Sequence, residues 1–448
     1  MAASRGTTAS TKRPVAIDLY AGAGGLSLGM EQAGFDVLAA AELDPIHALT
    51  HRFNLPQTAV LCRDLSDEPV VKVASALMDA AKVAARTHHA DELVELDAVV
   101  GGPPCQGFSV GGVRDAEDER NGQFLRFVDL VVALQPKVFL LENVSGLLEP
   151  RFESLRKEAL RRLTVDGGYE VTGFDEPVSA VEFGVPQRRR RVLVLGSRIG
   201  AAPNLVADET AARVTVGDAL AGLPDLRSYF ALLSTDEVPL KIDDLARLRT
   251  VRSVYARTLA GLELADNDLS WPRVHNAVLL TNSLRTVHKP KSIQRFRKTP
   301  QGGVEKISRL YRLDPETQAR TLRAGTGSDR GSHTSPRPIH PEKARVITVR
   351  EAARLHGYPD WFRFHGTNWH GHRQVGNSVP PPLAAAAGRA LIRALGSASV
   401  SRPTEAIRLG DPEWLWLGRS EAIEELSRLD GARTATPSSQ APLPSCER

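Results

Sequence analysis

Short apolar runs alternate with longer segments of helical periodicity over the first half of this 448-residue chain, and this alternation limits the folds that the chain can adopt. Two segments between the runs, 68–86 and 123–134, have helical periodicity. Runs that are apolar enough to form buried strands occupy residues 15–19, 37–41, 98–100, 137–141 and 191–195. The pattern predicts an α/β fold with a mostly parallel sheet that helices cover on both faces.

Three motifs begin at or just after the ends of these predicted strands, at Asp18, Cys105 and Glu142. In open α/β sheets, ligands bind at the carboxyl ends of the strands. We therefore expect the three motifs to meet at one edge of the sheet and to form the functional site there.

Cys105 follows Pro103 and Pro104 and precedes a glycine-containing stretch. Each proline fixes its own φ angle and restricts the residue before it, so a stiff turn presents the thiol. A single cysteine is more often a small buried side chain, so the surrounding motifs decide its role. Here they favour an exposed and positioned nucleophile.

The ordered motif set resembles that of the DNA cytosine-5 methyltransferases of bacterial restriction–modification systems. The matching segments are Asp18–Gly25, Ala41–Asp44, Arg63–Leu65, Pro103–Gln106, Glu142–Val144, Gln187–Arg191 and Gln374–Pro380. The resemblance implies a Rossmann-like domain that depends on S-adenosylmethionine, together with a smaller target recognition domain.

Regular periodicity is lost after about residue 196 and returns near residue 347, which divides the chain further. Trp414, Trp416, Ile423 and Leu426 indicate a short docked helix near the C-terminus. The expected parts are a disordered tail (1–13), a catalytic and cofactor-binding domain (14–198), the target recognition domain (199–345), a return segment that completes the catalytic domain (346–395), and a C-terminal helix with a disordered tail (396–448).

Methylation of cytosine at C5 requires that an electron-rich group first adds at C6, and a thiolate both attacks and leaves well. The resemblance gives this role to Cys105 and gives Glu142 the task of holding a proton at N3 of the ring. Arg189 and Arg191 alternate along a predicted strand, so they are expected to share one face, with Arg189 nearer to the cytosine O2 and to Glu142. Arg188 and Arg190 would project the other way.

The resemblance implies S-adenosylmethionine as the methyl donor. Glu42 is expected to bind the ribose hydroxyls and Asp64 the adenine amino group, while Leu43 replaces an aromatic residue and predicts weaker adenine stacking. Tyr20 replaces a phenylalanine and adds a hydroxyl. The other expected cofactor contacts are Asp18, the glycines Gly22, Gly24 and Gly25, whose backbone allows close approach, and Leu65, Pro103, Leu125, Asn377 and Ser378.

The formal net charge of +4 and the isoelectric point of about 9.0 permit binding to nucleic acid. Base flipping out of the duplex, which costs a few kcal/mol, would be offset by pocket contacts and by closure of the flap 106–120. Contacts to double-stranded DNA are expected from Gln106, Ser109, Arg188, Arg295, Arg297, Lys298, Arg320 and Arg323.

The three cysteines are far apart, which argues against a zinc site or a disulfide framework and for a reducing compartment. His365, His370 and His372 lack regular ligand spacing, so we expect a loop surface there and no metal. The first residues lack an apolar core and no window is apolar enough for a membrane span, so a cytoplasmic protein is expected.

Four other classes of protein share some of these features. A tRNA cytosine-5 methyltransferase of similar fold would tend to carry Cys-Phe-Thr, whereas Gln-Gly-Phe-Ser follows Cys105. A catalytically silent DNA-binding scaffold would have lost Cys105 or Glu142. A nucleotide-dependent oxidoreductase explains the glycine loop alone, and an amino-methylating enzyme would carry an aromatic residue in place of Cys105. The expectation is a DNA cytosine-5 methyltransferase that acts as a monomer and is functionally paired with a restriction endonuclease.

Overall fold

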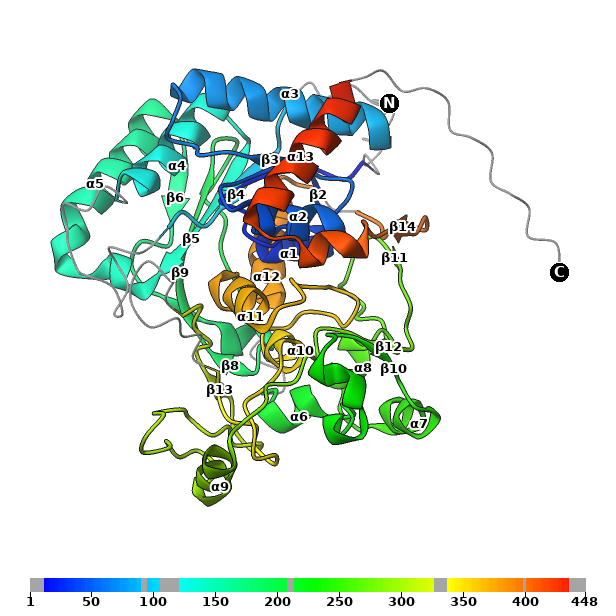
Figure 1. The fold of residues 1–448 in the computed structure, drawn as a ribbon. Helices are drawn as coiled ribbons and strands as arrows, with labels where there is room; N and C mark the ends of the chain where they lie inside the picture. Colours follow the sequence, from blue (N-terminus) through cyan, green and yellow to red (C-terminus); the bar gives the residue numbers. More distant parts are fainter. Residues whose placement is uncertain are drawn as a thin grey trace, which may run out of the picture.

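A computed structural model of the chain describes residues 12–89, 95–104, 121–207, 213–325, 337–397 and 400–434. Its centre is an eight-stranded sheet with the order β3-β2-β1-β4-β5-β9-β6, and β7 pairs with β9 (Figure 1). The strands are β1 (Val15–Leu19), β2 (Asp36–Glu42), β3 (Ala59–Cys62), β4 (Ala98–Gly101), β5 (Val138–Val144), β6 (Glu170–Thr172), β7 (Val178–Ser179) and β9 (Arg190–Ser197).

Strands β1 to β5 pair in parallel, while β9 runs antiparallel to β5, β6 and β7. The expected mostly parallel sheet is confirmed, and all five predicted strands are present. Strands β3, β6 and β7 were missed. β6 and β7 have only three and two residues, too few to show a periodic signal, and the second half of β3 is only partly buried.

Helices cover both faces of the sheet because the side chains of β1 alternate between two apolar clusters. Val15, Ile17 and Leu19 pack under α3 (Val70–His89) and α4 (Asn121–Leu134). Ala16 packs on the other face, under α1 (Gly25–Ala33) and α12 (Pro381–Ala394). α12, which comes late in the chain, packs directly against α1 on this face of the sheet.

A smaller lobe lies below the sheet in Figure 1 and contains the residues expected to recognise the target. A shared apolar cluster joins the two lobes, since Ala23 and Leu28 pack with Val216 and Leu322. The elements of the smaller lobe are α6 (Val216–Leu220), β10 (Val238–Pro239), α7 (Ile242–Thr250), α8 (Val254–Leu259), β12 (Leu279–Leu280), α9 (Pro290–Lys298) and β13 (Ala319–Arg320), and β13 pairs with β8 (Gln187–Arg188). Between the lobes lie α10 (Val349–Arg354) and α11 (Asn368–Asn377).

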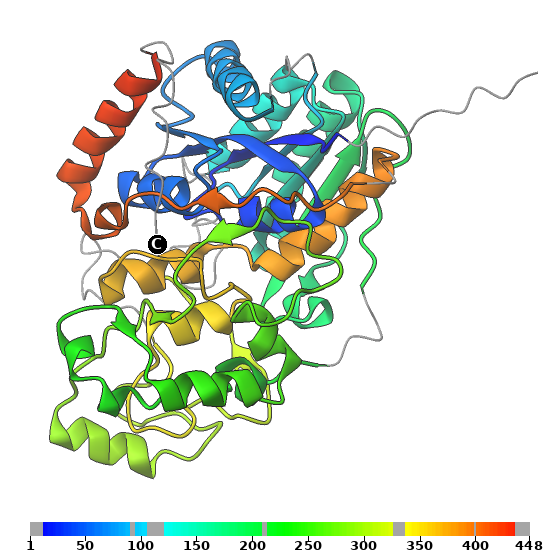
Figure 2. The same ribbon diagram turned by 90° about the vertical axis from the view of Figure 1, so that its right-hand side faces the viewer.

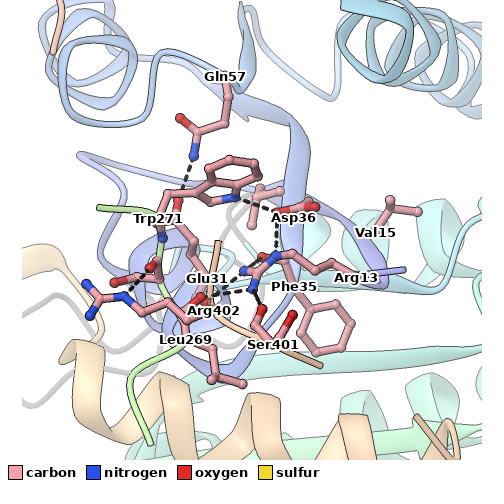
Figure 3. A network of polar contacts seen from close by, with 12 residues as sticks. Arg13, Val15, Glu31, Phe35, Asp36, Gln57, Leu269, Trp271, Ser401 and Arg402 are labelled. Carbon is pink, nitrogen blue, oxygen red and sulfur yellow. Dashed lines mark hydrogen bonds and ion pairs between the residues drawn. The ribbon is translucent and has the colours of Figure 1, made fainter. Parts of the chain in front are cut away.

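A buried network of polar side chains anchors the segment 269–273 on the catalytic sheet (Figure 3). Arg13 Nε donates to Asp36 Oδ1 at 2.8 Å, and Trp271 Nε1 donates to the same oxygen at 2.8 Å. Arg273 Nη2 lies 2.8 Å from Glu31 Oε2, and both of these side chains are buried. Loss of one partner would leave an uncompensated buried charge, so the network fixes this segment firmly.

The C-terminal segment returns to the sheet and packs beside β2 and β3. β14 (Ile407–Arg408) pairs in parallel with β11 (Arg273–Val274), and a short helical turn (Pro412–Trp416) leads into α13 (Arg419–Thr434). The helix packs on α2 (Pro45–Asn54). Of the residues that indicated it, Leu426 is buried as expected, whereas Ile423 and Trp416 are exposed, and Ala422 is buried beside Leu426. In the described ranges, no helix is long and apolar enough to cross a membrane.

Candidate active site

A cavity of about 600 Å³ opens at the carboxyl ends of β1, β2, β4 and β5, in the size range of about 300–1,000 Å³ that is usual for ligand pockets. It is lined by most of the residues predicted from the sequence, namely Tyr20, Gly22, Gly25, Glu42, Leu43, Asp64, Leu65, Pro103, Glu142, Arg191, Asn377 and Ser378. Asp18, Gly24, Leu125 and Arg189 do not line it. Cys105, Gln106 and Ser109 lie outside the described residues.

The glycine-rich loop after β1 forms one wall of the cavity. Gly22 and Gly24 have φ angles of +57° and +99°, which favour glycine, and Tyr20 also has a positive φ of +58°. A Cβ atom at Gly25 would lie 2.2 Å from the hydroxyl oxygen of Tyr358, so no other residue fits there. The Tyr20 hydroxyl donates to Gln123 Oε1 at 2.7 Å. A phenylalanine at this position could not form this hydrogen bond.

Glu42, at the end of β2, connects this strand to the glycine-rich loop after β1 by hydrogen bonds. Its carboxylate accepts hydrogen bonds from Gly22 N and Asp44 N, each at 2.8 Å. The neighbouring Leu43 is 56% exposed although it is apolar, and it lines the cavity. A ligand in the cavity would cover this side chain.

Asp18 supports the loop from beneath instead of facing the ligand. The side chain is fully buried, its Oδ2 accepts from Ser27 Oγ at 2.6 Å, and Oδ1 has no hydrogen-bond partner among the described residues. Burial raises the pKa of Asp18 to about 7, Ser27 lowers it in part, and the charge of Glu42 raises it further. The expected direct contact of Asp18 with the cofactor pocket is therefore wrong.

Glu142 forms an ion pair with Arg191, with 2.6 Å between Glu142 Oε1 and Arg191 Nε. We expected Arg189 to be the nearer partner of Glu142, and this expectation is wrong. The guanidinium of Arg189 is 2% exposed and donates to the carbonyl oxygens of Leu322, Gly376 and Ser378 at 3.2, 3.1 and 2.9 Å.

The two arginines diverge because the strand is interrupted between them. β8 ends at Arg188 and β9 begins at Arg190, and Arg189 N donates to Gln187 O at 2.8 Å. The alternation of side chains holds only along a continuous strand, so Arg189 turns away from Arg191. Arg188 and Arg190 are both exposed, as expected.

The end of β5 also holds the turn that leads to Cys105. Asn143 is buried, and its Nδ2 donates to Pro103 O at 3.4 Å. Pro103 and Pro104 line the same cavity as Glu142 and Arg191. The chain therefore enters the segment of Cys105 from within the cavity.

The residues predicted to contact DNA fall into two groups. Arg188 and Arg320 are opposite one another in the β8–β13 pair, and both are exposed. Arg320 stacks over Tyr311, with 4.0 Å from the guanidinium carbon to the ring centroid, and Arg323 is exposed nearby in the sequence. Arg295, Arg297 and Lys298 are on α9, at the end of the smaller lobe farthest from the sheet (Figures 1 and 2).

Several cavity residues were missed from the sequence: His47 on α2, Gln123 on α4, Arg373 on α11 and Arg419 on α13. Arg373 precedes Asn377 by one helical turn, and this spacing would have indicated a shared face. The other three come from segments whose position depends on tertiary packing.

The expected loop surface at the histidines is wrong. His370 and His372 belong to α11, and His365 and His372 are buried. Burial lowers the pKa of His372 to about 3 and that of His365 to about 4, so both rings are neutral. Among the residues that the structure describes, no group of three or more side chains could hold a metal ion.

The cavity fits S-adenosylmethionine. A Cβ atom placed on Gly22 would have nothing within 4 Å, so a ligand can approach the loop backbone closely. The Glu42 carboxylate can accept hydrogen bonds from ribose hydroxyls, and the exposed Leu43 offers an apolar surface to a base. Glu42 and Leu43 share this cavity with Glu142 and Arg191.

Comparisons with known proteins agree with this geometry. The profile of C-5 cytosine-specific DNA methylases matches residues 15–393. The type II methyltransferase M.XorII of Xanthomonas oryzae is 44% identical over 410 residues, 92% of each chain. M1.HphI of Haemophilus parahaemolyticus, also a type II methyltransferase, is 31% identical over 385 residues, 84% of this chain and 86% of the relative.

Two solved structures are also similar. A protein of an E. coli prophage that is described as a DNA modification methyltransferase is 32% identical, with a TM-score of 0.67, and the match covers 86% of this chain and 99% of that protein. Dnmt2 of S. pombe, at 15% identity and a TM-score of 0.54 over 86% of this chain and 100% of its own, shares the fold. The chain thus belongs to the C-5 cytosine-specific DNA methylase family.

Proposed function

We propose that this protein transfers the methyl group of S-adenosylmethionine to C5 of a flipped cytosine within a specific sequence of double-stranded DNA. One observation carries the proposal: the cavity that fits the cofactor also contains the Glu142–Arg191 ion pair and the turn that leads to Cys105. Methyl donor and target base would therefore meet within a single enclosed space.

Cys105 would act as the nucleophile. Its thiolate forms the Sγ–C6 bond, and the electron density of the ring then makes C5 nucleophilic. Glu142 holds a proton at N3, and Arg191 beside it stabilises charge that develops at the ring oxygen O2. Once the C5–CH3 bond has replaced the methyl–sulfur bond and S-adenosylhomocysteine has left, loss of the C5 proton to water would restore the C5–C6 double bond as the Sγ–C6 bond breaks.

Bound S-adenosylmethionine supplies the electrophilic methyl group. Glu42 would bind its ribose hydroxyls, Asp64 and Leu65 would face the adenine, and Asn377 and Ser378 would line the opposite wall. The exposed arginines Arg188, Arg320 and Arg323 would contact DNA, and α9 would contact it further along the duplex.

We further propose that the protein is the modification enzyme of a type II restriction–modification system and acts as a monomer. The two relatives named above are type II methyltransferases, which supports this role. DNA modified by the protein should then resist cleavage by an endonuclease that recognises the same sequence.

Bisulfite sequencing tests the proposal directly. Unmodified genomic DNA is incubated with the protein and S-adenosylmethionine, and protected cytosines within one short sequence are expected. Cys105→Ser, which should still bind S-adenosylhomocysteine, is the control and should protect no cytosine. Protection of tRNA in place of DNA would refute the proposal in favour of an RNA substrate.

A further inference from the structure

The C-terminal segment Ile407–Thr434 lies beyond the family match, which ends at residue 393, yet it is held firmly against the cofactor side of the sheet. Gly410 N donates to Phe53 O at 2.9 Å, and Gly366 N donates to Leu415 O at 2.8 Å. The buried face of α13 packs on α2 and on the ends of β2 and β3 (Figures 1 and 2). The start of α13 therefore has a fixed position relative to the cavity.

Arg419 is the first residue of α13, and its side chain lines the cavity together with Glu42 and Leu43. It is exposed, and it has no hydrogen bond or ion pair with any residue in the described part of the chain. A cation at the first position of a helix also opposes the helix macrodipole. Helix stability therefore does not account for an arginine at this position.

The charge of Arg419 acts on two residues beside Leu43, and both Arg419 and Leu43 line the cavity. Burial raises the pKa of Asp44, but His47, the hydrogen bond from Ile46 N and the cations Arg373 and Arg419 bring it below its ordinary value. Burial and the charges of Glu42 and Asp44 raise the pKa of Cys62 to about 11, and Arg419 opposes them. Asp44 follows Leu43 in the chain, and the Cys62 thiol donates to Leu43 O at 3.8 Å.

We propose that Arg419 covers the adenine ring of the cofactor, which would lie between its guanidinium group and the side chain of Leu43. This inference rests on the proposed function. Leu43 is aliphatic and offers no aromatic face, whereas a planar guanidinium stacks on aromatic rings and is attracted to their π electrons. Both side chains are exposed, so the ring would remove both from water.

Four described arginines line the cavity, namely Arg63, Arg191, Arg373 and Arg419, and Arg373 has a different environment from Arg419. Its guanidinium carbon lies 5.2 Å from the centroid of the Trp369 ring, so it already has an aromatic partner. Arg63 pairs with Glu68, and Arg191 pairs with Glu142. Among the described arginines of the cavity, Arg419 is therefore the one without an ion-pair or stacking partner.

Calorimetric titration of the full chain with S-adenosylhomocysteine and with S-adenosylmethionine measures the contribution of Arg419 to the affinity for each ligand. Arg419→Ala should weaken both ligands by the same factor, roughly 3- to 30-fold, which is the range of a partly desolvated cation–π contact. Arg428→Ala is the matched control, because Arg428 is exposed on the same helix and pairs with Glu425. It should leave both affinities within about twofold of the parent.

Arg419→Lys separates stacking from charge, since lysine keeps the cation without the planar face. It should recover only part of the lost affinity, and full recovery would overturn the stacking role. Only S-adenosylmethionine carries the sulfonium charge, so a change in the ratio of the two affinities would also overturn it. If the parent binds and Arg419→Ala binds equally well, this inference alone fails. If the parent binds neither ligand, the proposed function fails as well.

Discussion

Arg191 Nε lies 2.6 Å from Glu142 Oε1, across the antiparallel pair of β5 and β9. The strand register places Arg191 opposite Val144 and places Glu142 opposite Leu193, so the ion pair runs diagonally between the strands. Its geometry is set by the sheet before any substrate binds. A preorganised cation of this kind can stabilise developing charge without reorganisation during the reaction.

Arg191→Ala should lower the single-turnover rate of methyl transfer by roughly 100-fold or more, because a fixed electrostatic partner of the reacting ring is lost. The affinity for S-adenosylhomocysteine should change little. Arg190→Ala, at the exposed neighbouring position, is the control for general effects on the strand. An Arg191→Ala defect that is confined to DNA affinity would contradict the assigned role.

Arg189→Ala should destabilise the protein, because it removes a buried guanidinium that donates to Leu322 O, Gly376 O and Ser378 O. Hydrogen bonds to charged groups contribute about 1.5–3 kcal/mol each, so we expect the free energy of unfolding to fall by roughly 3 kcal/mol or more. Urea unfolding measures this loss. The exposed Arg188→Ala should stay within about 0.5 kcal/mol of the parent, and an equal effect of the two substitutions would refute the prediction.

Asp18 should make the stability of the protein depend on pH. Its pKa is about 7 in the folded chain against 3.8 as the ordinary value, so the folded state binds more protons between these values. Stability should therefore fall as the pH rises from about 4 to about 7. Asp18→Asn stays neutral, so it should lose this dependence and be more stable than the parent at about pH 8.

Urea unfolding at about pH 5 and about pH 8 tests this prediction. The exposed Asp67→Asn is the control and should follow the parent at both pH values. A difference between Asp18→Asn and the parent that is the same at both pH values would be inconsistent with titration of Asp18.

Arg320→Ala should weaken DNA binding and reduce its dependence on salt, because Arg320 and Arg188 form an exposed basic pair at the junction of the lobes. Loss of one phosphate contact should lower the slope of log affinity against log salt by about one. Arg161→Ala, on the exposed surface of α5 (Glu153–Arg161), should leave the slope unchanged. An unchanged slope for Arg320→Ala would remove Arg320 from the DNA interface.

The sequence predicted the central sheet because buried parallel strands appear as continuous apolar runs. Glu42 and Glu142 lie at the ends of two predicted strands, and the topology brings these strand ends together at the cavity. Asp64 was predicted only through the family resemblance, because the strand before it, β3, was missed. The prediction from sequence failed at Arg189, where a break between β8 and β9 ended the alternation that the argument assumed. It missed His47 and Arg419, because their approach to the cavity depends on how α2 and α13 pack. Local sequence patterns do not predict that packing.

The contact between α1 and α12 has a consequence for synthesis of the chain. The glycine loop at Gly22–Gly25 leaves the ribosome long before Asn377 and Ser378 on the opposite wall and α12 behind them, because these lie far later in the chain. Folding proceeds from the N-terminus during synthesis. A growing chain therefore cannot complete this cavity until Asn377, Ser378 and α12 have been made, and a chain that terminates before them would lack one wall of the cavity.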